Sequence, residues 1–529
     1  NTAIGRDALV DNTTGTNNVA IGENALANNT TASENTAVGQ NALLTNTTGG
    51  NLVAVGHDCL RLNTTGSNSV AIGLDAMRSN TEGANNVAIG HEALDANTTA
   101  NNNTAVGYVA LGANTTGTNN VAVGSTCLDA NTTGDQNVGV GRDALSANTT
   151  AGNGTAVGYV ALQANTTGSD NTGFGASTLR YNTTGASNTA VGVRAGEDID
   201  NGDRNTCIGV LAGANATTPD DLTAVGYGAG GTGTLTGHDN TCMGVNALTE
   251  CTSGAANTAI GRNCMDANTT ADNNTAVGYS AMTANTTGNL NVAIGGLALS
   301  SNTVGDRAVA VGYNALQAQN PSTNTDTYNV AVGLNAQFAT TTGVQNTAVG
   351  GLALSANTTG DNNVAIGYNA LAAATTADDN VGIGKDAAAA TTTGDLNVAI
   401  GRDALTTNTV GDRSIAIGVN ALGTQNPSTN TDMHNIGIGT NAGFDITTGK
   451  QNVLIGGNAG ANLTTANNNT AVGHNALDAA TTAATSVAIG FSALTAATTG
   501  SSNVAVGDNA LAAVTTGENN TAVGKSTLL

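Results

Sequence analysis

The stretch that decides the fold is Asn114-Thr115-Thr116-Gly117, followed after two residues by Asn120-Val121-Ala122-Val123-Gly124. The second part places Val at alternate positions and ends in Gly, whereas the first part is a cluster of Asn, Thr and Gly. Short runs rich in β-branched residues and bounded by Gly and Asn are typical of β-strands that end in turns. The same two pieces recur along the whole chain, so they define a repeat.

The repeat has a period of 17 residues. Aligned on the Gly of the Ala-Val/Ile-Gly motif, the step is 17 throughout from Gly5 to Gly226, then 18 to Gly244, and it reaches 21 only before Gly333 and Gly439. With this glycine as position 0, the consensus is Asn(−4), Thr/Val(−3), Ala(−2), Val/Ile(−1), Ala(+3), Leu(+4), Asn(+7), Thr(+8), Thr(+9) and Gly(+10). Each repeat is called a rung below, and the chain contains 31 rungs.

This period predicts an all-β fold, a parallel β-solenoid. Helix-pair repeats need about 30 residues or more, and the recurring Asn, Thr and Gly residues at +7 to +10 disfavour helices. Rungs stacked at about 4.8 Å would make a rod roughly 150 Å long, in which each rung contacts mainly its neighbours. Stacking should also align Asn(−4) and Asn(+7) into amide ladders and Thr(+8) and Thr(+9) into threonine ladders. Representative structural positions are Asn18, Asn120, Gly22, Gly124, Asn114 and Thr115.

Position −2 carries a restriction that calls for a packing partner. In an extended strand it faces away from positions −3 and −1, and it is almost always Ala, Gly or Cys, with Leu454 as the one large exception. A solvent-facing position would be expected to include polar residues over so many copies. We therefore expect a second backbone or sheet against this face, either from the opposite side of a flattened coil or from a neighbouring chain.

Composition narrows the class of protein. The chain has 529 residues, 71 of them Gly, no Trp, and a formal net charge of −23. Such an acidic chain without a basic cluster is a poor candidate for binding nucleic acid or an anionic membrane surface. No apolar stretch is long enough to span a membrane. Because Asn1 already lies inside a repeat, we expect no signal peptide and an excerpt or processed part of a longer protein.

The repeat Asn-Thr-Ala-Val-Gly-x-x-Ala-Leu-x-x-Asn-Thr-Thr-Gly-x-x resembles repeats of bacterial and phage tail-fibre-type proteins. Its core, as in Asn18-Val19-Ala20-Ile21-Gly22, is also similar to head repeats of trimeric autotransporter adhesins of the YadA type. The resemblance covers the whole chain and implies a left-handed parallel β-roll, an intertwined or side-by-side homotrimeric fibre, and a surface location. The chain departs from the adhesin heads in its longer period and in its added Asn-Thr-Thr-Gly corner.

Irregular rungs divide the array into three parts. Residues 1–191 are regular solenoid repeats, residues 192–244 are irregular, and residues 245–529 are regular again, with two four-residue loop insertions near 320 and 426. In the irregular part Gly replaces Leu(+4) in successive rungs and one residue is inserted, which predicts either a bend or bulge at a corner or a junction between two segments. The two insertions are either tolerated corner loops or part of a binding face.

No pattern of reactive residues predicts catalytic, cofactor-binding or metal-binding residues. The six cysteines mostly replace small residues of the consensus, as buried free thiols do, and the histidines at +1 do not lie on adjacent rungs. Exposed aromatic rings stack on sugars, and insertions in solenoids often form a binding face, so the +1 tyrosines and the insertion loops are candidate ligand contacts, although the pattern favours ordinary surface residues and corner loops. The residues concerned are Tyr108, Tyr159, Tyr279, Pro321 and Pro427.

These features together favour a structural or adhesive extracellular fibre, located on a cell or virion surface, over an enzyme. The expected partners are further copies of the chain, in a homotrimer, and a surface glycan or cell receptor. Neither nucleic acid nor a membrane inserted by this segment is expected, and no cofactor. Two alternatives remain: an ice-binding solenoid, suggested by the threonine ladders, and a glycan-processing enzyme on a solenoid scaffold.

Overall fold

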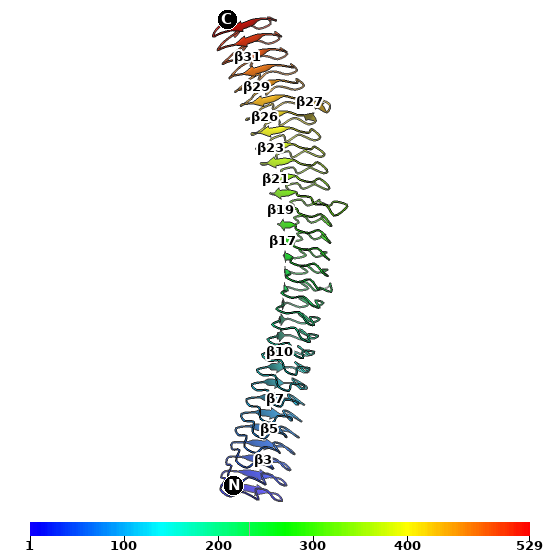
Figure 1. The fold of residues 1–529 in the computed structure, drawn as a ribbon, viewed down its shortest axis with the longest axis vertical. Coiled ribbons are helices and arrows are strands. Elements are labelled where there is room, and N and C mark those ends of the chain that lie inside the picture. Colours follow the sequence, from blue (N-terminus) through cyan, green and yellow to red (C-terminus); the bar gives the residue numbers. More distant parts are fainter. Residues whose placement is uncertain (232, 529) are drawn as a thin grey trace. The chain divides into compact units, whose positions relative to one another are not determined.

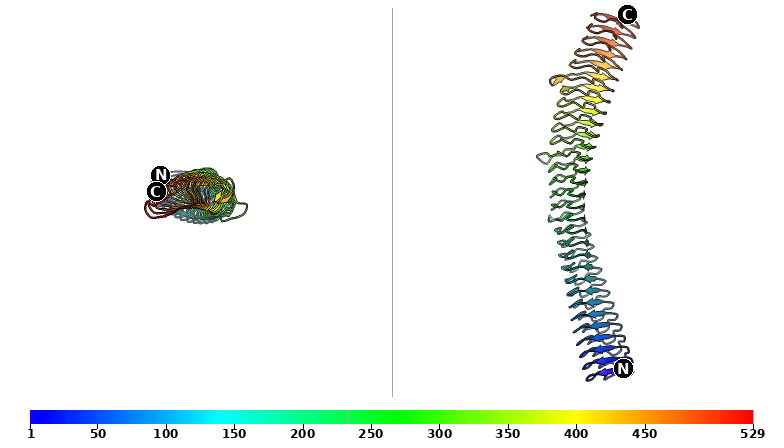
Figure 2. Two further views of the ribbon diagram at one scale, coloured as in Figure 1. Left: turned by 90° about the horizontal axis from the view of Figure 1, so that it is seen from above. Right: turned by 180° about the vertical axis from the view of Figure 1, so that it is seen from behind.

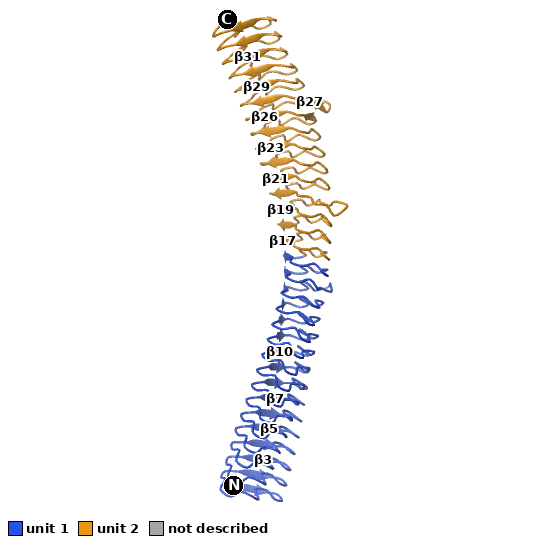
Figure 3. Cartoon of the chain, in the orientation of Figure 1, with its two compact units in different colours: residues 1–262 blue, residues 263–529 orange. Residues whose placement is uncertain are grey.

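The computed structural model describes residues 1–231 and 233–528, and in these it contains strands and turns but no helix. The chain divides into two compact units, Asn1–Arg262 and Asn263–Leu529 (Figure 3). Each unit is a stack of parallel strands in which the strand of one rung pairs with the strand of the next rung. The predicted all-β parallel β-solenoid is therefore confirmed for both units.

Unit 1 contains sixteen strands of three residues, one in each rung (Figure 1). All neighbouring strands described in it pair in parallel, as in Val121↔Val138 and Ala122↔Gly139. The strands are β1 (Thr2–Ile4), β2 (Val19–Ile21), β3 (Thr36–Val38), β4 (Val53–Val55), β5 (Val70–Ile72), β6 (Val87–Ile89), β7 (Thr104–Val106), β8 (Val121–Val123), β9 (Val138–Val140), β10 (Thr155–Val157), β11 (Thr172–Phe174), β12 (Thr189–Val191), β13 (Thr206–Ile208), β14 (Thr223–Val225), β15 (Thr241–Met243) and β16 (Thr258–Ile260).

Unit 2 repeats this arrangement and adds a second, two-stranded parallel sheet made by β25 and β27. Its strands are β17 (Thr275–Val277), β18 (Val292–Ile294), β19 (Val309–Val311), β20 (Val330–Val332), β21 (Thr347–Val349), β22 (Val364–Ile366), β23 (Val381–Ile383), β24 (Val398–Ile400), β25 (Gly411–Asp412), β26 (Ile415–Ile417), β27 (Thr431–Asp432), β28 (Ile436–Ile438), β29 (Val453–Ile455), β30 (Thr470–Val472), β31 (Val487–Ile489), β32 (Val504–Val506) and β33 (Thr521–Val523).

The glycine at position 0 ends each strand because no other residue fits there. Gly124 has φ +143°, and a Cβ added to it would lie 2.3 Å from the carbonyl oxygen of Gly141 on the next rung. Gly22 shows the same close approach, 2.5 Å from the carbonyl oxygen of Gly39. A side chain would therefore meet rigid backbone in a region of φ that L-residues avoid. The glycine column keeps consecutive rungs in close contact at the corner.

The core of each coil is narrow and made of small and medium side chains. Ala122 at −2, Cys127 at +3 and Leu128 at +4 are all fully buried. The strand of each rung and the segment that returns after it face each other across this core. The space between them holds little more than Ala on one side and Leu on the other. Such close packing makes a change of even one methylene costly, which explains why the consensus is so uniform.

Amide ladders run along both predicted asparagine columns, with different partners. At +7, the side-chain amide of Asn131 donates to Oδ1 of Asn114 at 2.9 Å, so this ladder joins amide to amide as predicted. At −4, Asn120 mainly bonds to backbone: its Oδ1 accepts from the amide nitrogen of Asn137 at 2.9 Å and its Nδ2 donates to the carbonyl of Gly134 at 2.8 Å. Asn18 donates in the same way to the carbonyl of Ala32 at 2.9 Å.

The threonines at +8 use their hydroxyl groups on the backbone instead of on each other. Thr115 Oγ1 donates to the carbonyl oxygen of Thr132 on the next rung at 3.1 Å. The equivalent bond recurs from Thr132 to Thr149 at 3.0 Å. The predicted threonine ladder at +8 therefore joins side chain to backbone, and its hydroxyls share carbonyl oxygens that already accept backbone N–H groups, as Thr132 does from Thr115 at 3.0 Å.

Position −2 packs against the opposite side of its own coil. A Cβ added to Gly139 would lie 2.5 Å from Sγ of Cys127, the residue at +3 of the preceding rung. Leu454 is accommodated because position +4 is Gly443 in the preceding rung and Gly460 in its own. Of the two packing partners that the sequence left open, the coil itself accounts for the restriction, so position −2 gives no support to a neighbouring chain.

The irregular segment 192–244 keeps the same strand pairing. Strands β12 to β15 pair in parallel, and the inserted residue does not disturb the register of Val225 with Met243. Where Gly196 replaces Leu(+4), Ile199 replaces Asn(+7), and a Cβ on Gly196 would lie 3.2 Å from Cδ1 of Ile199. The apolar volume lost from one position is therefore supplied by another within the same rung.

The two insertions form loops that project from the same side of unit 2 (Figure 2). A parallel bridge between Asp306 and Asp326 joins the first loop to the preceding rung, and the pairing of β25 with β27 joins the second loop in the same way. Each loop follows a buried glutamine, Gln319 or Gln425, that replaces Asn(+7). The side-chain oxygen of each glutamine accepts a hydrogen bond from the next Asn(−4) at 2.9 Å, which continues the polar ladder through the insertion.

Candidate functional site

The candidate interaction surface is the outward side of the strand column, called the strand face below and formed by the side chains at −3 and −1. Because alternate residues of a strand point to opposite sides, burial of position −2 directs both of these outward. In β2 to β16 of unit 1 the middle residue is buried and the third is half-buried or exposed. Ile72 and Ile89, for example, are 39% and 38% exposed.

The strand face carries no charge in any rung. Position −1 is Val or Ile throughout, apart from Phe174 and Met243, and position −3 is Thr, Val or Ile. Neighbouring +1 and +2 positions, by contrast, hold Arg, Lys, Asp and Glu, as in Arg142 and Asp143. Surface position alone therefore does not explain why charged residues are absent from the strand face. A long apolar strip bordered by polar residues is typical of an interaction surface.

The strand face of one unit is large enough for a stable protein–protein interface. Three residues at about 3.3 Å each, repeated at about 4.8 Å over sixteen rungs, give a strip of roughly 750 Å². A standard interface buries about 800 Å² on each partner. Burying the exposed part of one Val or Ile contributes about 1 kcal/mol, so sixteen rungs together can exceed the cost of association.

The predicted tyrosine contacts are exposed and lie beside the strand face. Tyr108, Tyr159 and Tyr279 are 54%, 53% and 57% exposed. Two of them make ring contacts within the +1 column: His91 stacks on Tyr108 at 5.4 Å, and the guanidinium of Arg142 lies 5.8 Å from the ring centre of Tyr159. The rings are accessible to a partner, but they form separate pairs along the column and not one continuous platform.

The prolines of the insertion loops are placed differently. Pro321 and Pro427 are buried, because their rings pack over Gly305 and Gly411, whose added Cβ atoms would each lie 3.0 Å from the proline Cγ. These rings are therefore not accessible to a ligand. The loops remain accessible at residues 322–324 and 428–430, which are exposed.

All six cysteines are free and buried, as the sequence predicted for substitutes of small residues. Burial raises the pKa of the Cys59 and Cys127 thiols to about 12. Cys207 and Cys242 lie two strands apart, with Ala224 between them in the sheet. A thiol with such a high pKa is a poor nucleophile and metal ligand, so these residues contribute packing.

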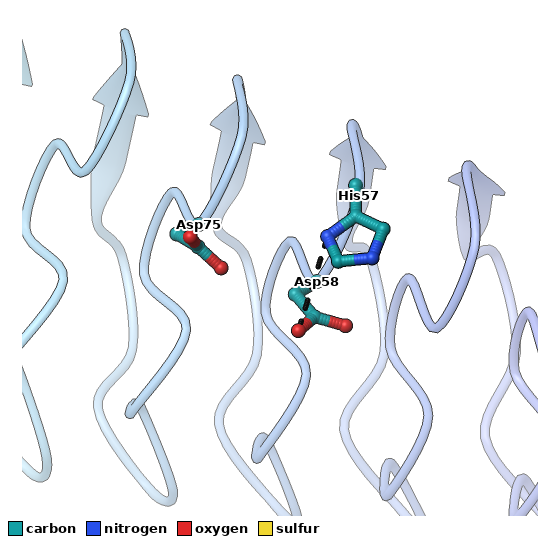
Figure 4. A group of neighbouring side chains, drawn as sticks. All are labelled: His57, Asp58 and Asp75. Carbon is teal, nitrogen blue, oxygen red and sulfur yellow. Dashed lines mark ion pairs between the residues drawn. The ribbon is translucent and has the colours of Figure 1, made fainter.

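One group of side chains in unit 1 has the composition of a metal site. His57, Asp58 and Asp75 each place a potential ligand atom within 4.8 Å of the others (Figure 4). This group was not predicted from the sequence, because the histidines do not lie on adjacent rungs. The other two members of the group are carboxylates, which lie at +2 of the same rung and of the next rung. The available signal was the order His-Asp at +1 and +2 followed 17 residues later by a second Asp.

In comparison with known proteins, no family model matches the chain and no curated protein is similar to it. The described residues include no helix with the length and apolar character needed to cross a membrane. The assignment of a role therefore rests on the fold and its surfaces.

Proposed function

We propose that this chain is a structural segment of a fibre that associates side by side with further copies of itself through the strand face, as a homotrimer of left-handed β-rolls. The observation that carries the proposal is the column at −1, which is Val or Ile in every rung except for Phe174 and Met243, points outward and is never polar or charged. A monomeric solenoid has no need for that restriction, because the cores of its coils are already filled by positions −2, +3 and +4.

The resemblance of the repeat to tail-fibre and adhesin-head sequences supports the same role. We place the fibre outside the cell, on a cell or virion surface, where it would extend and present binding surfaces and perform no catalysis. The exposed loop residues 322–324 and 428–430 and the exposed tyrosines at +1 are the parts of the chain available for a surface glycan or receptor.

The experiment compares two triple variants with the wild-type chain by light scattering and sedimentation. Ile89→Glu/Val106→Glu/Val123→Glu places three carboxylates on the strand face. Thr99→Glu/Thr116→Glu/Thr133→Glu places the same charges on the same rungs at the exposed +9 position. We expect three times the chain mass for the wild type and the control, and a lower mass for the strand-face variant. A monomeric wild type, or equal masses for both variants, would contradict the proposal.

One observation favours a second candidate function, ice binding. Position −3 is Thr in seven consecutive strands of unit 1, β10 to β16, and their regular spacing of about 4.8 Å would present an ordered array of methyl and hydroxyl groups to water. The Thr(+8) column cannot serve in this way, because its hydroxyls bond to backbone. A thermal hysteresis assay distinguishes the two functions. Ice binding requires activity in this assay, whereas an association that buries the strand face removes the −3 threonines from water and predicts no activity.

A further inference from the structure

The group formed by His57, Asp58 and Asp75 lies outside the strand face and has no part in the proposed association. His57 and Asp58 occupy +1 and +2 of one rung, and Asp75 occupies +2 of the next. Because β4 and β5 pair in register, Val53 with Val70, the two carboxylates belong to the same column of the stack. One potential ligand atom of each residue lies within 4.8 Å of the others, and Figure 4 shows the three side chains on two neighbouring rungs.

The carboxylates are held in place, whereas the imidazole is accessible. The side chains of Asp58 and Asp75 are 12% and 18% exposed, and that of His57 is 49% exposed. Oδ1 of Asp58 accepts a hydrogen bond from Asn41 Nδ2 at 2.8 Å, and its Oδ2 lies 3.9 Å from Nδ1 of His57. The group thus combines two positioned oxygens with a nitrogen that can rotate toward them.

The hydrogen-bond ladder of the +2 column indicates where a cation is needed. Asn24 donates to Asn41 at 3.1 Å, and Asn41 donates to Asp58 at 2.8 Å. The next member of the column is a second carboxylate, Asp75, and an ionised carboxylate has no proton to donate. Two acceptors of like charge therefore follow one another at the rung spacing, and a bound cation would relieve their repulsion.

The residue at +1 distinguishes this group from other carboxylates of the same column. Elsewhere an Asp at +2 follows a permanently charged side chain, as in Arg6-Asp7, Arg142-Asp143, Lys385-Asp386 and Arg402-Asp403. Here the preceding residues are His57 and Leu74. A neutral imidazole is a common metal ligand, so the position that normally supplies a fixed positive charge instead supplies a donor atom.

Two arginines compete for the carboxylates. Arg61 Nη1 lies 3.3 Å from Oδ2 of Asp58, and Arg78 Nη1 lies 3.8 Å from Oδ1 of Asp75. The better contact of Arg78 is with Asp95, at 3.1 Å. The arginine side chains are 43% and 42% exposed while the carboxylates are largely buried, so these ion pairs are only partly screened by water and compete with a metal ion for the same oxygens.

We propose that His57, Asp58 and Asp75 bind one divalent transition-metal ion, with further positions of the ion open to water. One imidazole and two carboxylates are ligands that suit Zn²⁺. Ca²⁺ favours six to eight oxygen ligands, which this group does not supply.

The chain contains its own control at His91. His91 and Glu92 repeat the order of a histidine at +1 and a carboxylate at +2, but position +2 of the next rung is Val109, so the third ligand is missing. His91→Ala therefore removes an equivalent exposed imidazole from an incomplete group.

The test is calorimetric titration of Zn²⁺ into the full chain and into His57→Ala, Asp75→Asn and His91→Ala, in a buffer without phosphate. We expect one ion per wild-type chain, at least tenfold weaker binding in His57→Ala and Asp75→Asn, and unchanged binding in His91→Ala. Arg61→Ala should bind more tightly, because a competitor is removed. Absence of binding to the wild type, or equal losses in His57→Ala and His91→Ala, would overturn the proposal. The exposed substitutions His57→Ala and His91→Ala leave the core intact, so misfolding does not confuse the comparison.

Discussion

Leu454 shares with Leu463 the space left by the missing side chain of Gly460, since a Cβ on Gly460 would lie 2.8 Å from Cδ2 of Leu454 and 2.7 Å from Cδ1 of Leu463. Leu454 belongs to the −2 column, where all the remaining rungs have Ala, Gly or Cys. Gly460 belongs to the +4 column, where most rungs have Leu. The pair exchanges the usual sizes across one core. This exchange is direct evidence that the two columns pack against each other inside a single chain.

A double-mutant cycle tests this exchange. Leu454→Ala should destabilise unit 2 by about 2–5 kcal/mol, because it leaves a cavity in a fully buried site. Gly460→Ala should also destabilise the wild type, but less in the Leu454→Ala background, where the clash with Leu454 is relieved and only the contact with Leu463 and the positive φ of Gly460 remain. Urea unfolding of the four chains gives the coupling energy. Additive effects would show that the two positions do not pack together.

The glycine column permits a sharp comparison of two Gly→Ala substitutions. Gly124→Ala should cost more than about 3 kcal/mol, because the new Cβ would meet the carbonyl of Gly141 and the φ angle is unfavourable. Gly351→Ala at +1 should change stability by less than about 0.5 kcal/mol, since its nearest neighbour would be Cδ2 of Tyr368 at 3.6 Å. Thermal unfolding followed by circular dichroism measures both, and similar losses would refute the backbone explanation.

Asn131→Ala should lower stability by about 1–3 kcal/mol, because it leaves neighbouring buried polar groups without partners. Asn131 donates to Asn114 at 2.9 Å and accepts from Asn148 at 2.9 Å. Thr116→Ala, at an exposed position of the preceding rung, serves as the control and should change little. Denaturant midpoints of the two variants provide the measurement, and a neutral Asn131→Ala would show that the ladder is dispensable.

The buried thiols predict a loss of stability in alkali. Burial raises the pKa of Cys127 to about 12, whereas an unfolded thiol has a pKa of about 8.5. The stabilisation associated with the neutral thiol is therefore fully present below about pH 8.5 and is lost as the pH rises toward about 12. Between pH 7.5 and pH 10.5 the wild type should lose about 3 kcal/mol more than Cys127→Ala.

Urea unfolding at the two pH values checks this, and Ala is the consensus residue at that position, so the variant should fold normally. Equal losses would mean that the Cys127 thiol ionises as readily in the folded chain as in the unfolded one.

Much of the fold follows from residues that are close in sequence. The 17-residue period, the strands at −3 to −1 and the turn glycines could be predicted because each rung repeats the same local preferences 31 times. The ladder positions could also be predicted, because parallel stacking in register places each residue beside its counterpart. The group formed by His57, Asp58 and Asp75 was harder to predict from the sequence. Asp75 comes close to His57 only through that stacking, and sequence spacing alone does not specify which side chains turn toward each other.

The sequence by itself determined that this chain is a parallel β-solenoid, because periodic β-branched residues and glycines allow no other regular structure. Only the tertiary structure decided which side of each strand is interior. Position −2 could have faced a neighbouring chain or the same coil, and both choices fit a column of small residues. The positions of Leu454 and Cys127 decide for the coil, and they thereby turn the uncharged Val and Ile column outward, where it is available to a partner.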